Sequence, residues 1–300
     1  MAIQNSLQKS KGNQRLGITA YLTGDAVKNQ INQVVGGKNG QRFISAIVSA
    51  VNTNPTLQEC TNQSILSGAL LGESLKLSPS PQLGHYYLVP FNDKNKGKVA
   101  QFQMGYKGYI QLAIRSGQYK KINVIAVKEG ELEYFDPLNE EIKINMMIDK
   151  WDEREAAPTI GYYAMFELVN GFRKAIYWSK AQMEAHALKY SPGYKKDRRD
   201  GSNHTFWSKD FDGMAYKTML RQLISKWGIM SIDMQSAIDA DMAVINEDGS
   251  KDYVDNDDSI IDAEPPQSEE PQPEPRQEAE KKPETTQQPT DAQMALFGNK

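Results

Sequence analysis

The sequence is poor in the residues that build disulfide or metal frameworks. It has one cysteine, Cys60, among 300 residues, so no intrachain disulfide can form and a cage of thiolates around a metal is excluded. The three histidines, His85, His186 and His204, are widely spaced, and a histidine-rich metal site is therefore not expected. We expect a protein of a reducing, cytosolic setting.

Long apolar runs are also missing. None approaches the ~18 residues that a membrane-spanning helix needs. The first twelve residues are polar and lack the apolar centre of a secretory signal. We therefore expect a cytoplasmic protein that makes no contact with a membrane.

Several catalytic motifs are absent as well. The sequence has no Gly-x-x-x-x-Gly-Lys-Ser/Thr loop, no strand-to-helix Gly-x-Gly-x-x-Gly, no His-Glu-x-x-His and no Gly-x-Ser-x-Gly. These absences argue against a P-loop ATPase, a dinucleotide-binding enzyme, a zinc protease and a hydrolase with a nucleophile elbow.

The net charge of −3 hides a division of the chain. Residues 246–300 hold fifteen Asp+Glu and five Lys+Arg, a net of −10, which leaves 23 acidic and 30 basic residues, a net of +7, in residues 1–245. Seven of the fourteen prolines lie between Pro265 and Pro289, and this composition predicts a disordered acidic tail. A basic body favours a polyanionic partner, although a net of +7 is also compatible with an ordinary solvated surface.

The order of the expected elements indicates an α+β fold, with an antiparallel sheet and hairpins flanked by N-terminal and C-terminal helices. We expect a flexible N-terminus (1–20), one domain (21–245) and a disordered tail (246–300). Expected helices are 21–35, 41–51, 63–75, 106–116, 179–189, 205–227 and 231–244. Expected strands are 85–91, 99–104, 122–127, 132–135, 159–169 and 172–178, with a hairpin turn at Asn170-Gly171 and a basic loop at 191–203.

Residues 106–115 carry the most informative pattern. Aromatic and apolar side chains fall on one side of the expected helix, and Lys107, Gln111 and Arg115 form a polar stripe on the other. The preceding strand is expected to turn Gln101 and Gln103 outward, and lysines flank the segment at positions 94, 96, 98, 120 and 121. Cations interleaved with rings such as Tyr106 suit single-stranded nucleic acid, whereas the alternative is an amphipathic helix with a wet face.

A second basic cluster lies in residues 205–227. Lys217 and Arg221 are one helical turn apart and are expected to point away from the apolar row of this helix. The cations of the 191–203 loop would extend the same surface. The alternative is that Lys217 and Arg221 pair with Asp210 or Asp212. Such surface ion pairs would each contribute under about 1 kcal/mol to stability.

One triplet suggests a different function. Asp136, Glu141 and Lys143 resemble the carboxylates and lysine of a metal-dependent nuclease, in which carboxylates hold a cation and lysine orients water. The segment is rich in charge, so solvated loop charges are the alternative interpretation.

Three segments resemble the RecT family of phage single-strand annealing proteins. Leu83–Phe91 (LGHYYLVPF) and Gln101–Gly117 (QFQMGYKGYIQLAIRSG) are long and specific motifs, and Ala215–Trp227 (AYKTMLRQLISKW) is similar to the late basic helix of the family. The resemblance extends from about residue 21 to about residue 245, with the motifs in the same order.

The resemblance implies a recombination protein that binds single-stranded DNA and the annealed duplex. It implies annealing of complementary strands without ATP and without covalent catalysis, by a homo-oligomer that forms rings or helical filaments. The expected partners are an exonuclease, which exposes the strand, and a host single-strand-binding protein. No cofactor is expected to be required, and Mg²⁺ is expected to act at most on DNA binding or assembly. The metal-dependent nuclease and a passive single-strand-binding coat, which protects strands but does not pair them, are the two alternatives to the annealing function.

The resemblance also implies roles for matching residues. The expected phosphate contacts are Lys107, Arg115, Lys217 and Arg221, and the expected neighbours of the strand are Tyr106, Gln101, Gln103 and Gln111. The acidic tail is expected either to compete with DNA for the basic surface or to recruit a host partner through its apolar end, Met294–Phe297.

Overall fold

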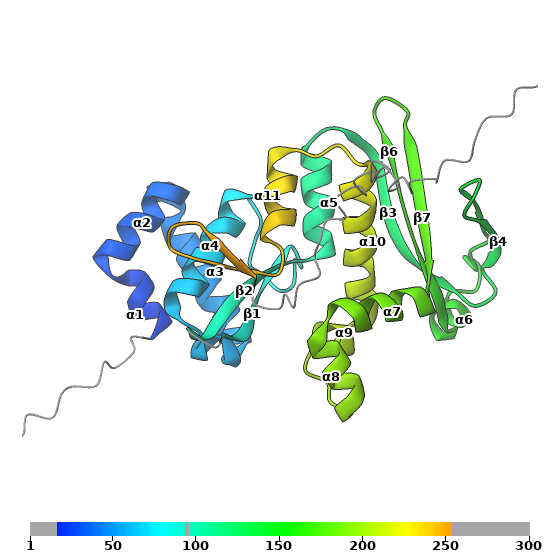
Figure 1. Ribbon diagram of the computed structural model, residues 1–300. Helices are drawn as coiled ribbons and strands as arrows, with labels where there is room; N and C mark the ends of the chain where they lie inside the picture. Colours follow the sequence, from blue (N-terminus) through cyan, green and yellow to red (C-terminus); the bar gives the residue numbers. More distant parts are fainter. Residues whose placement is uncertain (1–16, 94–95, 254–300) are drawn as a thin grey trace, which may run out of the picture. The chain divides into compact units, whose positions relative to one another are not determined.

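The computed structural model describes residues 17–93 and 96–253 of the chain. It opens with helices, coloured blue to cyan in Figure 1: α1 (Ile18–Thr23), α2 (Asp25–Val35), α3 (Gly37–Thr53), the 3-10 turn η1 (Pro55–Glu59) and α4 (Asn62–Ser74). The three helices expected here are confirmed, but the first is divided at Gly24, where the backbone is extended. Helix α3 buries Phe43, Ile47 and Val51 at helical spacing.

The first sheet is antiparallel and has the order β1 (Tyr86–Asp93), β2 (Gly97–Met104), β8 (Ala243–Ile245), β9 (Lys251–Tyr253). The expected β1–β2 hairpin is confirmed, and α4 packs on it. Strands β8 and β9 were not expected. Helix α11 (Ile232–Ala240) ends before the predicted limit of 244, and the three residues that follow Met242 join the sheet instead.

The second sheet has the order β3 (Tyr119–Lys128), β6 (Thr159–Leu168), β7 (Arg173–Ser179). Its β6–β7 turn at Asn170-Gly171 is confirmed, and Gly171 has the positive φ of 89° that such a turn requires. Strands β4 (Leu132–Asp136) and β5 (Glu141–Ile144) form a separate hairpin, which is followed by α6 (Trp151–Ala156). Strand β5 and helix α6 were not expected, because charged residues interrupt the apolar pattern of both.

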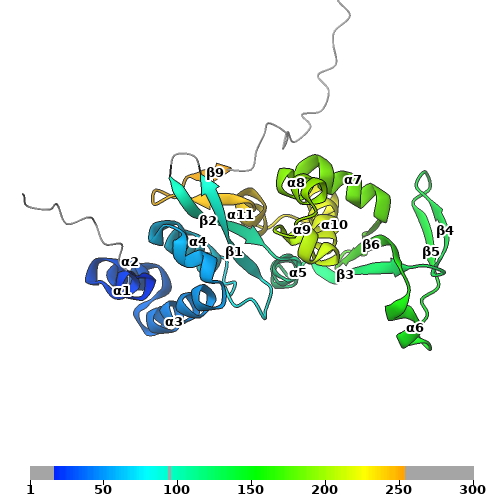
Figure 2. The same ribbon diagram turned by 90° about the horizontal axis from the view of Figure 1, so that it is seen from below.

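The C-terminal helices correct two expectations. The basic segment predicted as a loop is mostly helix α8 (Pro192–Asp200), capped by the Ser191 hydroxyl and closed by Gly201 at φ 65°. The long helix expected over 205–227 is divided into α9 (Phe206–Lys209) and α10 (Phe211–Trp227) at Asp210, whose carboxylate caps α10. Helix α9 packs on both α10 and α8, and α7 (Lys180–Tyr190) packs on α8 (Figure 2).

Helix α10 organises the core around the second sheet. It packs against helix α5 (Tyr106–Arg115) and against β3, β6 and β7, and Met219, Leu220 and Leu223 are fully buried. These elements confirm the expected α+β class. Among the residues described, no helix is both long and apolar enough to cross a membrane. The described chain includes residues 17–20, in and before α1, and residues 246–253, which end in β9. The rest of the N-terminus expected to be flexible (1–20) and of the tail expected to be disordered (246–300) lies outside the described residues.

Candidate nucleic-acid interface

The start of α5 is held backbone to backbone against the chain that enters β1. The Gly105 amide donates to the His85 carbonyl at 2.9 Å. A Cβ at Gly105 would lie 2.1 Å from the Gly84 carbonyl oxygen, and a Cβ at Gly108 would lie 2.1 Å from that of His85. Because only glycine permits this approach, the segment Gly105-Tyr-Lys-Gly108 is fixed in place. Its two central side chains are thereby projected from a rigid base.

Aromatic rings and a cation gather at this point. A side chain at Gly84 would meet the Tyr87 hydroxyl at 3.1 Å and Lys107 Cδ at 3.4 Å, so these two groups flank the same position. The Phe206 ring lies 5.5 Å from the Tyr87 ring, and the Lys107 ammonium lies 6.0 Å from the Tyr106 ring centroid. We call Tyr87, Tyr106, Lys107, Gln111 and Phe206 the α5 surface.

The members of the α5 surface are accessible to a ligand. Lys107 and Gln111 are exposed, one turn apart on α5, and Phe206 is 37% exposed. Tyr106 is partly buried because its edge packs on Tyr216, with the ring centroids 5.5 Å apart. The sequence analysis missed Phe206 and Tyr87, since Phe206 is about a hundred residues from α5 and no local pattern joins them.

Two positive charges act on His85, which lies beside the α5 surface. Its pKa is lowered, first by partial burial and then by the positive charges of Arg115 and Lys107. The Ser78 amide donates a hydrogen bond to Nδ1 of the ring at 3.3 Å, and the neutral form of the ring can accept this bond. The two cations therefore act on the same region, and this region is electropositive.

Arg115 has a structural contact in addition to its exposure. Its guanidinium donates to the carbonyl oxygens of Lys76, at 3.1 Å, and Leu75, and so closes the C-terminal end of α4. Two carbonyl contacts leave N–H donors of the guanidinium available. Arg115 thus joins α4 to α5 and adds positive charge beside His85.

The flanking lysines are less available than the sequence suggested. Lys98 pairs with Glu59, and Lys120 and Lys121 pair with Glu167. Lys94 lies outside the described residues. These three flanking lysines therefore already have acidic partners.

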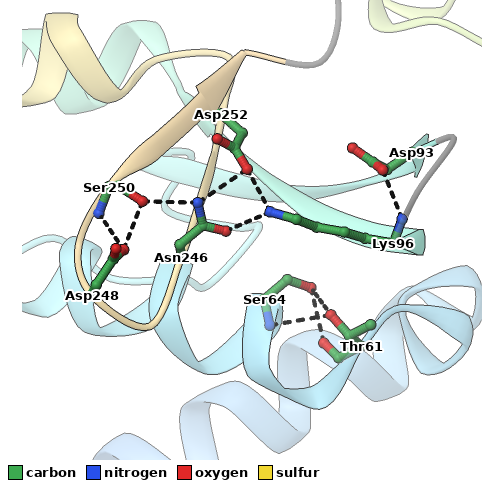
Figure 3. A network of polar contacts seen from close by, with 8 residues as sticks. All are labelled: Thr61, Ser64, Asp93, Lys96, Asn246, Asp248, Ser250 and Asp252. Atoms are coloured by element: carbon green, nitrogen blue, oxygen red, sulfur yellow. Dashed lines mark hydrogen bonds and ion pairs between the residues drawn. The ribbon is translucent and has the colours of Figure 1, made fainter.

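Lys96 ties the β1–β2 turn to the β8–β9 hairpin (Figure 3). Its ammonium lies 2.5 Å from Asp252 Oδ2 and 2.8 Å from Asn246 Oδ1, and its amide donates to Asp93. The Asn246 amide group in turn donates to Asp252 and Ser250. The chain beyond 245 is therefore part of the first sheet.

The predicted outward orientation of Gln101 and Gln103 is wrong. Gln101 is 1% exposed and Gln103 is 8% exposed. The Gln101 side-chain amide donates to the Met242 carbonyl at 2.6 Å, and that of Gln103 donates to Gln101 Oε1 at 2.6 Å. The reason is the segment at β8, which was not predicted: β8 pairs with β2, and the Met242 carbonyl just before β8 accepts from Gln101.

The predicted orientation of Lys217 is also wrong. Lys217 is 7% exposed, and its ammonium donates to Asp241 Oδ1 at 2.7 Å instead of to Asp210 or Asp212. Asp241 also accepts from the Met104 amide at 2.9 Å and from the Tyr109 hydroxyl at 3.0 Å. Burial lowers the pKa of Lys217, and the Asp241 charge opposes this effect.

Arg221, one turn further along α10, is half-buried. Its charge contributes, after burial, to the lowering of the pKa of His186 to about 4. Arg221, whose charge acts on His186 of α7, remains a candidate contact, while Lys217 does not.

The nuclease triplet does not form a metal site in the structure. Asp136 accepts hydrogen bonds from the Leu138 amide at 2.8 Å and the Asn139 side chain at 2.7 Å, and Lys143 pairs with Glu133 at 2.5 Å. In residues 17–93 and 96–253, no three His, Cys, Asp or Glu side chains are grouped to hold a metal ion. These residues serve the turn and pairing of the β4–β5 hairpin.

Comparisons with known proteins agree with the three motifs of the sequence. A family model described as the RecT family matches residues 41–259. The chain is 40% identical over 279 residues to the uncharacterized protein YqaK of Bacillus subtilis, covering 90% of this chain and 89% of that protein. It is 28% identical over 246 residues to Protein RecT of Escherichia coli, covering 78% of this chain and 86% of that protein. The chain belongs to the RecT family, and is a phage-type DNA recombination and strand-annealing protein.

Proposed function

We propose that the protein binds single-stranded DNA at the α5 surface and anneals complementary strands without ATP, as a homo-oligomer. The observation that supports this most directly is the grouping of Tyr87, Tyr106 and Phe206 with Lys107 on a glycine-fixed base. Rings stack on unpaired bases whatever their identity, and cations follow the phosphates. Such a surface needs no covalent chemistry.

The free energy of annealing comes from the DNA. Pairing and stacking supply roughly 1.4 kcal/mol per base-pair step. The protein has to neutralise phosphates, hold the strand extended and leave the base edges open to a second strand. Arg115, Arg221 and Gln111 extend the proposed contact beyond Lys107, and no cofactor is required, with Mg²⁺ acting at most on binding or assembly.

The primary experiment follows duplex formation by fluorescence with two complementary labelled oligonucleotides, Mg²⁺ and no nucleotide. Pairing faster than in the protein-free control supports the proposal. Bound strands that stay separate and intact would favour a passive coat. Shortened strands would favour the nuclease.

Lys107→Ala tests the site. We expect weaker DNA binding on all sequences and a salt slope, log Kd against log salt, that is smaller by about 1. Lys120→Ala is the matched control, because Lys120 is already paired with Glu167 at 2.5 Å on β3. Equal losses in the two variants, with both proteins folded, would remove the α5 surface as the binding site.

A further inference from the structure

Residues 129–157 form an arm of unusual charge in a basic protein. This segment contains β4, β5 and α6 and holds ten Asp+Glu and three Lys+Arg, a net of −7. The remainder of residues 1–245 therefore has a net charge of +14. We call residues 129–157 the acidic arm.

The acidic arm is attached firmly at its base. Glu131 is fully buried and accepts from Arg154 Nε at 2.6 Å, from the Lys128 amide at 2.8 Å and from the Met147 amide at 3.2 Å. Figure 1 shows β4 alongside β7, where the rings of Phe135 and Tyr177 lie 5.0 Å apart. The arm is thus a fixed feature and can present a defined surface.

The acidic arm exposes large apolar side chains. Leu138 is 87% exposed, Ile148 is 69% exposed and Trp151 is 55% exposed. Asp149 and Asp152 stand between or beside them, and no lysine or arginine of the described chain pairs with either. Exposed apolar groups with a polar rim mark an interaction surface, and the net charge of −7 disfavours DNA as the partner.

Helices α7 and α8 carry the complementary surface. Residues 180–200 hold six Lys+Arg and three Asp+Glu, and one of these acids, Asp197, is buried. Lys195 and Lys196 are exposed and form no ion pair in the described ranges, while Tyr190 is 42% exposed. We call α7 and α8 the basic helix pair.

We propose that the acidic arm of one copy of the chain docks on the basic helix pair of the next copy. Within residues 17–93 and 96–253, no ion pair or ring contact joins the two surfaces of a single chain. Two complementary surfaces that do not meet within one chain generate a head-to-tail contact, which closes into a ring or continues as a filament. This inference rests on the proposed function, in which the protein acts as a homo-oligomer. It identifies the two surfaces through which neighbouring copies meet.

Charge reversal tests the contact in the full chain without DNA. The arm variant is Asp149→Lys/Glu155→Lys, the helix variant is Lys195→Glu/Lys196→Glu, and the swap variant carries all four changes. Asp239→Lys/Glu247→Lys, at exposed acids outside the arm, is the matched control. Sedimentation velocity measures association in about 0.1 M and about 1 M salt, where the Debye length falls from about 10 Å to about 3 Å. Circular dichroism checks folding.

We expect each single-surface variant to lower the association constant at least tenfold in low salt, and the control to leave it unchanged. The swap variant restores association, because the reversed arm then meets a reversed helix pair. A wild-type protein that stays monomeric, a loss without recovery in the swap variant, or equal loss in the control overturns the contact.

The helix variant also separates this contact from DNA binding. If Lys195 and Lys196 bind DNA instead, that variant weakens DNA binding and leaves association unchanged, which overturns the inference. Failure of annealing by a protein that associates as expected would count against the proposed function and not against this contact.

Discussion

Two buried tyrosines, Tyr86 and Tyr109, differ in what their hydroxyl groups meet. The Tyr109 hydroxyl donates to Asp241 Oδ2 at 3.0 Å, next to the buried Lys217 ammonium. The Tyr86 hydroxyl has no hydrogen-bond partner, and it is the one such buried side-chain atom among the described residues. We expect Tyr109→Phe to lower the free energy of unfolding by about 1.5–3 kcal/mol, since a hydrogen bond to a charged group is lost.

Tyr86→Phe is the matched control for that change. It removes a hydroxyl that makes no hydrogen bond, so the free energy of unfolding should stay the same or rise. Urea unfolding of both variants measures the difference. Equal destabilisation would show that the Asp241 network contributes nothing beyond packing.

Asp197 makes the stability of the protein depend on pH. It accepts from Ser208 Oγ at 2.7 Å, from the Thr205 amide at 2.8 Å and from Ser202 Oγ at 2.7 Å. Burial by itself raises the pKa of Asp197, but these hydrogen bonds outweigh burial and hold the pKa well below its ordinary value. Stability from a depressed carboxyl pKa is present above the unfolded pKa of about 3.9 and is lost as the pH falls below it.

The expected result is a melting temperature that falls between about pH 5 and about pH 2, the range in which such a carboxylate is protonated. Asp197→Asn should melt lower than the wild type at neutral pH and show a shallower fall on acidification. Thermal melts across this range measure both. A parallel acid profile in the variant would assign the acid sensitivity to other carboxylates.

At the scale of elements, the contact between α5 and the entry to β1 depends on glycine. A methyl group at Gly108 would lie 2.1 Å from the His85 carbonyl oxygen, and a backbone atom can yield only if α5 moves. We expect Gly108→Ala to cost about 1–3 kcal/mol, as overpacking does. DNA binding should weaken as well, because Tyr106 and Lys107 move with the helix.

Gly37→Ala is the control, at a helical position of α3 where a methyl group meets nothing within 4 Å. Alanine should stabilise this helix by about 0.5–1 kcal/mol relative to glycine. Chemical denaturation compares the two variants. Destabilisation of similar size at both positions would mean that the close approach at Gly108 is not tight in solution.

At the scale of the whole molecule, the acidic tail and the basic α5 region have opposite charges. Residues 254–300 hold twelve Asp+Glu and four Lys+Arg, a net of −8. We expect a chain that ends at Tyr253 to bind single-stranded DNA more tightly, with a gain that shrinks as salt rises. Removal from residue 246 would also remove β9 and Asp252, the partner of Lys96, so the cut belongs after Tyr253.

The control for the truncation is a full-length chain in which the acidic residues of 254–300 are replaced by their amides. Fluorescence anisotropy with a labelled oligonucleotide measures the affinities. The chain with the neutral tail could bind the oligonucleotide like the wild type while the truncated chain binds it more tightly. In that case the gain in affinity comes from removing the bulk of the tail and not its charge.

Local patterns in the sequence were sufficient for the element types and for part of the site. Helix α5, the β1–β2 hairpin and the Asn170-Gly171 turn follow from periodicity and turn residues that act within a few positions. Lys107 and Gln111 lie on the exposed face that the helical spacing predicts. The three RecT-type motifs likewise indicated the family that the comparisons support.

Only the tertiary structure decided which polar side chains are buried and which distant rings meet. The pattern of one helix or strand cannot show that Lys217 pairs with Asp241, or that Gln101 donates to the Met242 carbonyl, because both contacts join residues more than twenty positions apart. The contact between Phe206 and Tyr87 has the same origin. A sequence pattern records the periodicity of one element, whereas burial depends on which other elements pack against it.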